Sequence, residues 1–337
     1  NLERYPVLFM HILVLTRLMD TPVSRRTVLA SAGTAAVGVA TLGANGVLAG
    51  DWTRVESGTG KTLHAVTRAE SDVYAVGASG RVLRRSDGSW SVYDTTGPTG
   101  GQKTLYGADV TDGGRLLWVA GSSGSVGAYD LANGSVTSYK PPNVSPTFTD
   151  IAVAGFSGAE TVYLTKSSGE VYVGTRADTK EGGMTWTARD TGGSYTIQAI
   201  DFYTPERGRV VSTNSSVYKT TDAGSTWTQV GIADSAASTY DIVSGPDRVF
   251  VGAATGRLWR HDCDCSFWTP LQAGSKAVRG LARDGARVLG AGESGRAFDR
   301  DEDGFSVTDT PTGNTLLDAS IGETDILVGN SGTIIER

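Results

Sequence analysis

A unit of about forty residues recurs along most of the chain, and this repetition constrains the fold more than any other feature. In each copy two short apolar runs flank a glycine, or a serine in one copy, and these positions follow one another at intervals of 37 to 47 residues. They are Gly80, Gly124, Gly169, Ser216, Gly256, Gly295 and Gly332. Glycine suits a tight hairpin in which one residue has positive φ. Each unit therefore predicts two antiparallel strands joined by a tight turn.

Two further strands complete each unit. The first strand of the unit is expected to begin at Leu63, Leu105, Phe148, Ile197, Tyr240, Val278 and Leu316. The last strand carries a tryptophan in several copies, namely Trp90, Trp186, Trp227 and Trp268. Four short strands per unit form a propeller blade, and radial repetition of blades leaves few open sheet edges. We therefore predict an all-β, seven-bladed β-propeller with four antiparallel strands per blade, since no helical period of 3.6 residues is visible.

The two ends of the repeated region predict how the ring closes. The seventh unit stops at Arg337 after its third strand, whereas residues 51–55 have the pattern of a fourth strand with no unit before them. These residues are expected to supply the outer strand of blade seven. Residues 51–337 are therefore predicted to form one propeller domain and not two domains.

Residues 1–50 are expected to lie outside the propeller. We interpret residues 1–18 as an upstream extension and residues 19–50 as the core of an export signal. The pair Arg25 and Arg26 precedes a weakly apolar Ala/Gly/Val stretch, which resembles a twin-arginine signal. An uncut signal that tethers the protein to a membrane is the alternative. We expect an exported protein, either extracellular or at the cell surface.

Composition narrows the classes of partner and the source. The formal net charge of −6 argues against general nucleic-acid binding. Seven lysines stand against 23 arginines, and 25 aspartates against 11 glutamates, a surface composition that points to a halophilic, haloarchaeal source. We expect a monomer. The two cysteines, Cys263 and Cys265, cannot form a disulfide framework, and free thiols, a local disulfide and a metal site all stay open.

One motif gives the repeat a family resemblance. Residues 220–227 fit the pattern S/T-x-D-x-G-x-T-W through Asp222, Gly224 and Trp227, while residues 179–186 fit with Glu181 in place of the aspartate and residues 86–90 form a shortened copy. This motif resembles the Asp-box of BNR-repeat propellers, a group that spans sialidases and exported propellers similar to photosystem II assembly factors. The resemblance implies a WD40- or YVTN-like propeller in which the boxes are structural and lie away from the ligand face.

Candidate ligand residues lie where the first strands of the units begin. They are His64, Tyr106, Gln198, Tyr240 and Arg279. Aromatic and arginine side chains commonly dominate binding, and variable loops on a rigid scaffold commonly carry it. We therefore predict a non-catalytic scaffold that binds a protein or glycan partner, with no catalytic residue and no cofactor.

A sialidase-type glycoside hydrolase is the alternative function. In such an enzyme Tyr240 and Glu293 would imitate the nucleophile pair, with Arg279 nearby, and the carboxylates would need a defined separation. An ordinary ion pair between Arg279 and Glu293 within one blade is the other explanation of these residues.

Two sets of aspartates are candidate cation ligands. Asp150, Asp241 and Asp318 occupy equivalent positions in three units, where they either hold a cation or water in the channel or hydrogen-bond a neighbouring blade. The second set follows the pattern D-x-D-x-D-G, which opens many calcium loops, and consists of Asp299, Asp301 and Asp303. The closing acid of such a loop is missing, so an acidic, solvated turn is the alternative to a Ca²⁺ site.

Overall fold

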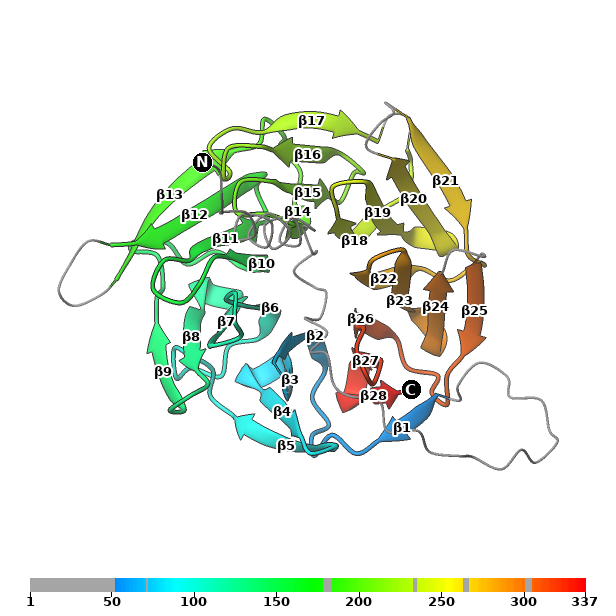
Figure 1. The fold of residues 1–337 in the computed structure, drawn as a ribbon, viewed down its shortest axis with the longest axis horizontal. Helices are drawn as coiled ribbons and strands as arrows, with labels where there is room; N and C mark the ends of the chain where they lie inside the picture. The colour runs from blue at the N-terminus through cyan, green and yellow to red at the C-terminus, as the bar shows by residue number, and fades with distance from the viewer. Residues whose placement is uncertain (1–51, 71, 178–182, 233–234, 263–266, 301–304) are drawn as a thin grey trace, which may run out of the picture.

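In the computed structural model, residues 52–70, 72–177, 183–232, 235–262, 267–300 and 305–337 are described. They form a ring of seven four-stranded antiparallel sheets around a common axis (Figure 1). Blade one contains β2 (Leu63–Ala69), β3 (Asp72–Gly77), β4 (Val82–Ser86) and β5 (Ser89–Asp94). Blade two contains β6 (Leu105–Val110), β7 (Leu116–Gly121), β8 (Val126–Asp130) and β9 (Ser135–Ser138). Blade three contains β10 (Phe148–Ala154), β11 (Thr161–Lys166), β12 (Glu170–Arg176) and β13 (Met184–Asp190).

The remaining blades repeat this arrangement. Blade four contains β14 (Ile197–Phe202), β15 (Gly208–Ser212), β16 (Val217–Thr220) and β17 (Thr228–Gly231). Blade five contains β18 (Thr239–Ser244), β19 (Arg248–Ala253), β20 (Arg257–Asp262) and β21 (Trp268–Gln272). Blade six contains β22 (Val278–Asp284), β23 (Arg287–Gly292), β24 (Arg296–Arg300) and β25 (Phe305–Asp309). Blade seven contains β26 (Leu316–Ser320), β27 (Ile326–Gly329), β28 (Ile334–Glu336) and β1 (Thr53–Val55).

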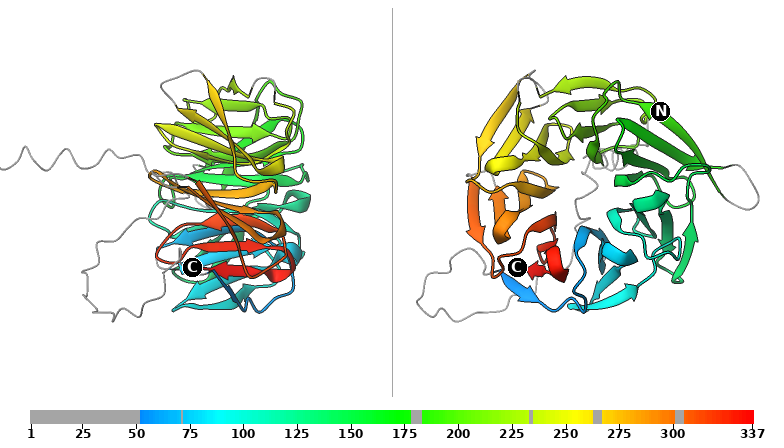
Figure 2. Two further views of the ribbon diagram at one scale, coloured as in Figure 1. Left: turned by 90° about the vertical axis from the view of Figure 1, so that its right-hand side faces the viewer. Right: turned by 180° about the vertical axis from the view of Figure 1, so that it is seen from behind.

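The seventh blade closes the ring with the first strand of the described chain. β1 pairs antiparallel with β28, so that Thr53 lies opposite Glu336 and Val55 opposite Ile334. Figure 1 shows β1 in blue beside β28 in red, and Figure 2 shows the flattened ring from the side and from behind. The predicted seven blades, the four antiparallel strands in each and the closure by the N-terminal strand are all confirmed.

The recurrent glycine is needed for two reasons that Gly332 illustrates. Its φ is +68°, which an L side chain rarely adopts, and a Cβ atom added there would lie 1.9 Å from the carbonyl oxygen of Thr59. The segment entering the next blade therefore passes directly over the turn. In blade four the left-handed residue is Ser215, with φ of +69°, one position before the predicted Ser216.

The hydrophobic core is divided among the interfaces between blades. Seven clusters of buried residues each combine side chains from two neighbouring blades. The cluster between blades six and seven, for example, contains Leu289 from blade six, with Leu327 and Ile335 from blade seven. Trp52, which precedes β1, is buried in the same cluster. Each blade is therefore stabilised mainly by its neighbours.

Tryptophans of the outer strands link blades by hydrogen bonds. The indole N–H of Trp186 donates to the carbonyl oxygen of Tyr139 at 3.1 Å, and that of Trp268 donates to Val230 at 2.9 Å. The indole of Trp90 donates to the Glu336 carboxylate at 2.7 Å. In each case the acceptor belongs to the preceding blade. The apolar part of the indole can therefore pack against neighbouring side chains while its N–H group is hydrogen-bonded.

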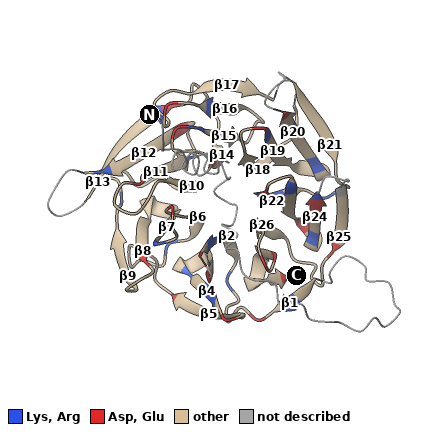
Figure 3. Cartoon of the chain, viewed as in Figure 1, with Lys and Arg blue, Asp and Glu red and all other residues tan. Residues whose placement is uncertain are grey.

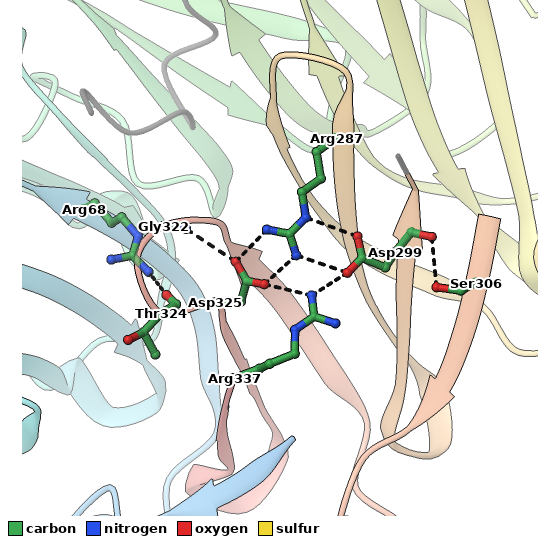
Figure 4. Close-up of polar contacts among 8 residues, drawn as sticks. All are labelled: Arg68, Arg287, Asp299, Ser306, Gly322, Thr324, Asp325 and Arg337. Carbon is green, nitrogen blue, oxygen red and sulfur yellow. Dashed lines mark hydrogen bonds and ion pairs between the residues drawn. The ribbon is translucent and has the colours of Figure 1, made fainter. Parts of the chain in front are cut away.

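An ion-pair network joins blades six and seven (Figure 4). The Arg287 guanidinium donates to Asp299 of its own blade at 3.0 and 3.2 Å and to Asp325 of blade seven at 3.0 Å. Arg337 donates to Asp325 at 2.8 Å and also binds Asp299. Burial alone would raise the pKa of Asp299, but hydrogen bonds from Arg287 and Arg337 hold it below its ordinary value of 3.8.

Several sequence predictions fall outside the described residues. These are the twin-arginine signal, Glu181 of the motif copy in blade three, Cys263 and Cys265, and Asp301 and Asp303 of the calcium pattern. Across the part of the chain that is described, no helix combines the length and hydropathy needed to span a membrane.

Candidate functional site

The first strand of each blade lies innermost in the ring, and we call it the inner strand (Figure 1). A β-bulge near the start of every inner strand aims one side chain at the mouth of the channel. In β2 the register shifts between Leu63 and Ala65, which leaves His64 as the extra residue. The same shift occurs in all the other inner strands, where the extra residues are Tyr106, Thr149, Gln198, Tyr240, Arg279 and Leu317. Each of the seven is partly exposed and lies between two buried residues. Bulges re-aim side chains in this way because they interrupt the strand's alternation.

These seven residues line one pocket of about 150 Å³ at the channel mouth. The loops that precede the inner strands and the turns between second and third strands surround it, and we call this side of the ring the pocket face. The turns on the opposite side form the far face. A pocket of this size, lined by aromatic, amide, hydroxyl, guanidinium and carboxylate groups, can hold one side chain or a small polar group of a ligand.

Arg279 occupies the blade-six side of the pocket. Its guanidinium carbon lies 3.9 Å from the ring centroid of Tyr240, which places the cation over the aromatic face. The guanidinium also forms an ion pair with Glu293 of the same blade. The Arg279 hydrogen bond, with a smaller opposing effect of burial, holds the pKa of Glu293 below its ordinary value. Arg279 Nε is buried and has no hydrogen-bond partner among the described residues.

His64 and Tyr106 form an aromatic pair on the opposite side. Their ring centroids are 4.9 Å apart and the planes are tilted by 55°. Burial lowers the pKa of His64 below 6.5, so the imidazole is neutral at pH 7. This side of the pocket therefore presents two aromatic rings, whereas the opposite side presents the guanidinium of Arg279.

The aspartates that follow the bulges connect neighbouring blades. Asp150 accepts the backbone N–H of Ile200 at 3.0 Å, and Asp241 accepts that of Leu281 at 2.7 Å. Asp318 accepts the N–H of Val66 at 2.8 Å, which joins blade seven to blade one. All three are less than a tenth exposed. The structure thus shows the interblade hydrogen bonds that the sequence analysis weighed against a cation in the channel.

The structure brings together all five residues that the sequence singled out as ligand candidates, namely His64, Tyr106, Gln198, Tyr240 and Arg279. The inner strand of blade five begins at Thr239, one residue earlier than predicted, and this places Tyr240 in register with His64. Sequence reasoning missed Thr149 and Leu317. They were recognisable as the residue after the first buried position of an inner strand, the same register that His64 occupies.

The motif turn in blade four has a closed hydrogen-bond pattern. Asp222 accepts the backbone N–H of Thr226 at 2.9 Å, and the N–H of Gly224 donates to the Thr220 hydroxyl at 2.9 Å. Gly224 has φ of +77°, and Trp227 packs against the core between blades three and four. This turn lies on the far face. Its geometry accounts for a structural role of these residues.

Asp299, the first residue of the calcium pattern, is the one member that lies within the described residues. Both of its carboxylate oxygens accept hydrogen bonds from Arg287, within the network of Figure 4. Among the residues that the structure describes, no group of three or more histidine, cysteine or acidic side chains is arranged to hold a metal ion. The calcium site stays a prediction because its other two aspartates are not described.

Comparisons with known proteins place the fold. No protein-family model matches the sequence, and no curated protein sequence matches it significantly. Among solved structures, the chain is similar to YCF48 bound to a D1 peptide, with 15% identity, a TM-score of 0.70 and coverage of 86% of this chain and 97% of that one. YCF48 from Cyanidioschyzon merolae gives 16% identity, a TM-score of 0.64 and coverage of 85% and 98%. The WD40 propeller domain of Doa1 gives 13% identity, a TM-score of 0.65 and coverage of 84% of this chain and 94% of that one. At these identities the likeness shows a shared β-propeller fold.

Proposed function

We propose that this chain is a non-catalytic binding propeller that presents its pocket face to a protein partner. The observation that carries the proposal is the set of seven bulges, which place seven side chains of six chemical kinds around one pocket. A bulge disturbs regular pairing, and its repetition in every inner strand at the same point favours a binding role. Two of the similar structures support a protein as ligand, because one is YCF48 in complex with a D1 peptide and another is a WD40 domain.

The chemistry of the pocket favours binding over glycoside hydrolysis. A sialidase-type site would bring three guanidinium groups together with a Tyr–Glu pair, whereas the described lining residues include a single arginine, Arg279. That arginine is paired with Glu293 inside its own blade. The lining carboxylates are Asp150, Asp241 and Asp318, and each accepts a backbone N–H from the next blade. No observation in the described part of the chain favours the hydrolase.

Site-specific photo-crosslinking in the source organism tests the proposal. A photoreactive residue at Gln198 should give adducts with a discrete protein, and Tyr240→Ala should reduce their yield. The same photoreactive residue at Phe156, a far-face position that is 68% exposed, serves as the matched control. Equal yields of protein adducts from Gln198 and Phe156 would contradict the proposal. Turnover of a sialoside that Tyr240→Phe abolishes would replace it with the hydrolase, and a glycan-array signal without protein adducts would replace the protein by a glycan.

The proposal includes export to the cell surface through the twin-arginine pattern at Arg25 and Arg26, action as a monomer, and a halophilic source. It also retains the calcium loop of blade six as a hypothesis. Addition of Ca²⁺ should then raise the melting temperature, because a ligand that binds only the folded state stabilises it. An unchanged melting temperature at millimolar Ca²⁺ and low ionic strength would remove the metal from the proposal.

A further inference from the structure

The lysines of this chain are concentrated on the pocket face. Of seven lysines in the sequence, four lie in loops that precede inner strands, and these are Lys61, Lys103, Lys140 and Lys276. Lys166 ends β11 on the same side. Lys219, in β16, lies toward the far end of its strand, and Lys180 is not described. Within the described parts of the loops before inner strands, Glu56 is the one acidic residue.

The described turns of the far face are rich in acidic residues, several of which pair with arginines at the neighbouring strand ends, such as Arg283, Arg287 and Arg337. These turns contain two arginines, Arg115 and Arg207, against nine acidic residues. The acidic residues are Glu70, Asp87, Asp112, Glu160, Glu206, Asp222, Asp247, Glu323 and Asp325. Charged residues occur in every blade (Figure 3), and the described lysines other than Lys219 lie on the pocket face. A protein of net charge −6 thus places most of its described lysines around a pocket whose own lining includes Asp150, Asp241 and Asp318.

Three of these lysines are available to a partner. Lys61, Lys103 and Lys276 are exposed, and none has an ion-pair partner among the described residues. Lys166 differs because it pairs with Glu170, and Lys140 differs because its ammonium group donates to Ser145 at 2.9 Å. The three available lysines come from loops entering blades one, two and six, so they lie on different sides of the pocket. Unpaired cations that surround a pocket attract a ligand of opposite charge.

We propose that the pocket face binds an acidic, extended segment of a partner protein, with Lys61, Lys103 and Lys276 contacting carboxylates around the pocket. This inference rests on the proposed function and names the chemistry of its partner. A peptide is favoured over a nucleic acid because the net charge of the chain is −6, and because the aromatic groups lie inside a pocket of about 150 Å³ that admits one side chain. The amide of Gln198, which lines the pocket, is a hydrogen-bonding group for that side chain.

Fluorescence anisotropy with two matched peptides tests this inference on the full chain. The first probe is a twelve-residue peptide of alternating glutamate and alanine, and the second has glutamine in place of glutamate. The glutamate peptide should bind, and its affinity should fall as the salt concentration rises. The triple variant Lys61→Glu, Lys103→Glu and Lys276→Glu should weaken binding at least about tenfold, since each reversed charge now repels the peptide. Lys219→Glu is the matched control and should change the affinity less than about twofold.

Several results would overturn the inference. The first two are equal affinity for both peptides and binding of neither peptide. The others are a loss of affinity in Lys219→Glu as large as that in the triple variant, and binding of a DNA oligonucleotide of the same charge more tightly than the glutamate peptide. Self-association of the chain that the triple variant abolishes would identify a second copy, through its acidic far face, as the occupant instead. Thermal melting of each variant confirms that the fold is retained. If crosslinks from Gln198 persist while the glutamate peptide fails, the proposed function stands and only the acidic partner falls.

Discussion

Replacement of Trp52 by alanine measures how much the N-terminal closure stabilises the ring. Trp52 is 7% exposed and packs in the core between blades six and seven. Burial of an aromatic side chain removes about 150–250 Å² from water, which at about 25 cal/mol per Å² corresponds to about 4–6 kcal/mol. The Arg337 guanidinium lies 4.4 Å from the ring centroid and adds about 0.5–2 kcal/mol. Tryptophan-to-alanine substitutions in protein cores cost about 3–5 kcal/mol, and we expect a loss in that range.

Differential scanning calorimetry provides the assay. For a large domain each kcal/mol lowers the melting temperature by about 2–4 °C, so Trp52→Ala should lower it by about 6–20 °C. Trp52→Phe keeps an aromatic ring and should lower the melting temperature much less than Trp52→Ala. Phe156→Ala is the control for removal of an aromatic side chain that is 68% exposed, and it should change the free energy of unfolding by less than about 0.5 kcal/mol. If Trp52→Ala has as small an effect as Phe156→Ala, the closure does not stabilise the ring and our reasoning is wrong.

Three further predictions concern other parts of the chain. Arg25→Lys with Arg26→Lys should retain the protein inside the cell, because the export receptor reads the arginine pair, and unchanged amounts in the medium by immunoblot would contradict this. Gly332→Ala should lower the melting temperature markedly, because φ is +68° and the new Cβ would lie 1.9 Å from a backbone oxygen, whereas an unchanged melting curve would refute that strain. The folded-state pKa of Asp299 is below 3.8, so its ion pairs stabilise the protein fully well above pH 3.8 and less as the pH falls below that value. Asp299→Asn should therefore melt at a lower temperature than the parent protein at neutral pH, and this difference in melting temperature should shrink in acid. A difference that stays constant with pH would exclude a stabilising role of the Asp299 carboxylate charge.

The fold was predictable because its strongest signals are local. Each turn needs a residue with positive φ, and glycine at Gly80 or Gly332 marks that need directly in the sequence. The short fourth-strand pattern at residues 51–55 likewise predicted the closure, since the seventh unit ended without an outer strand. In blade four, where a serine replaces the glycine, the predicted turn position Ser216 was one residue too late, since Ser215 has the positive φ.

The site was predictable in part. His64 and Tyr240 were recognised from their position at the start of inner strands, but the bulge that aims them at the channel is a property of cross-strand register and has no local sequence signal. The stacking of Arg279 on Tyr240 depends on the packing of two blades, and the contact of Arg337 with Asp299 joins residues 38 positions apart. Such contacts follow only from the closed ring, which fixes how neighbouring blades face one another.

The seven bulges also separate what the ring recognises from what holds it together. At each bulge the buried neighbours, such as Leu63 and Ala65, belong to the core, while the residue between them is partly exposed at the pocket. Substitutions at these positions should therefore disturb the core less than substitutions at their buried neighbours, so that ligand preferences can change with a smaller loss of stability. A library randomised only at the bulges would turn this ring into a reprogrammable receptor.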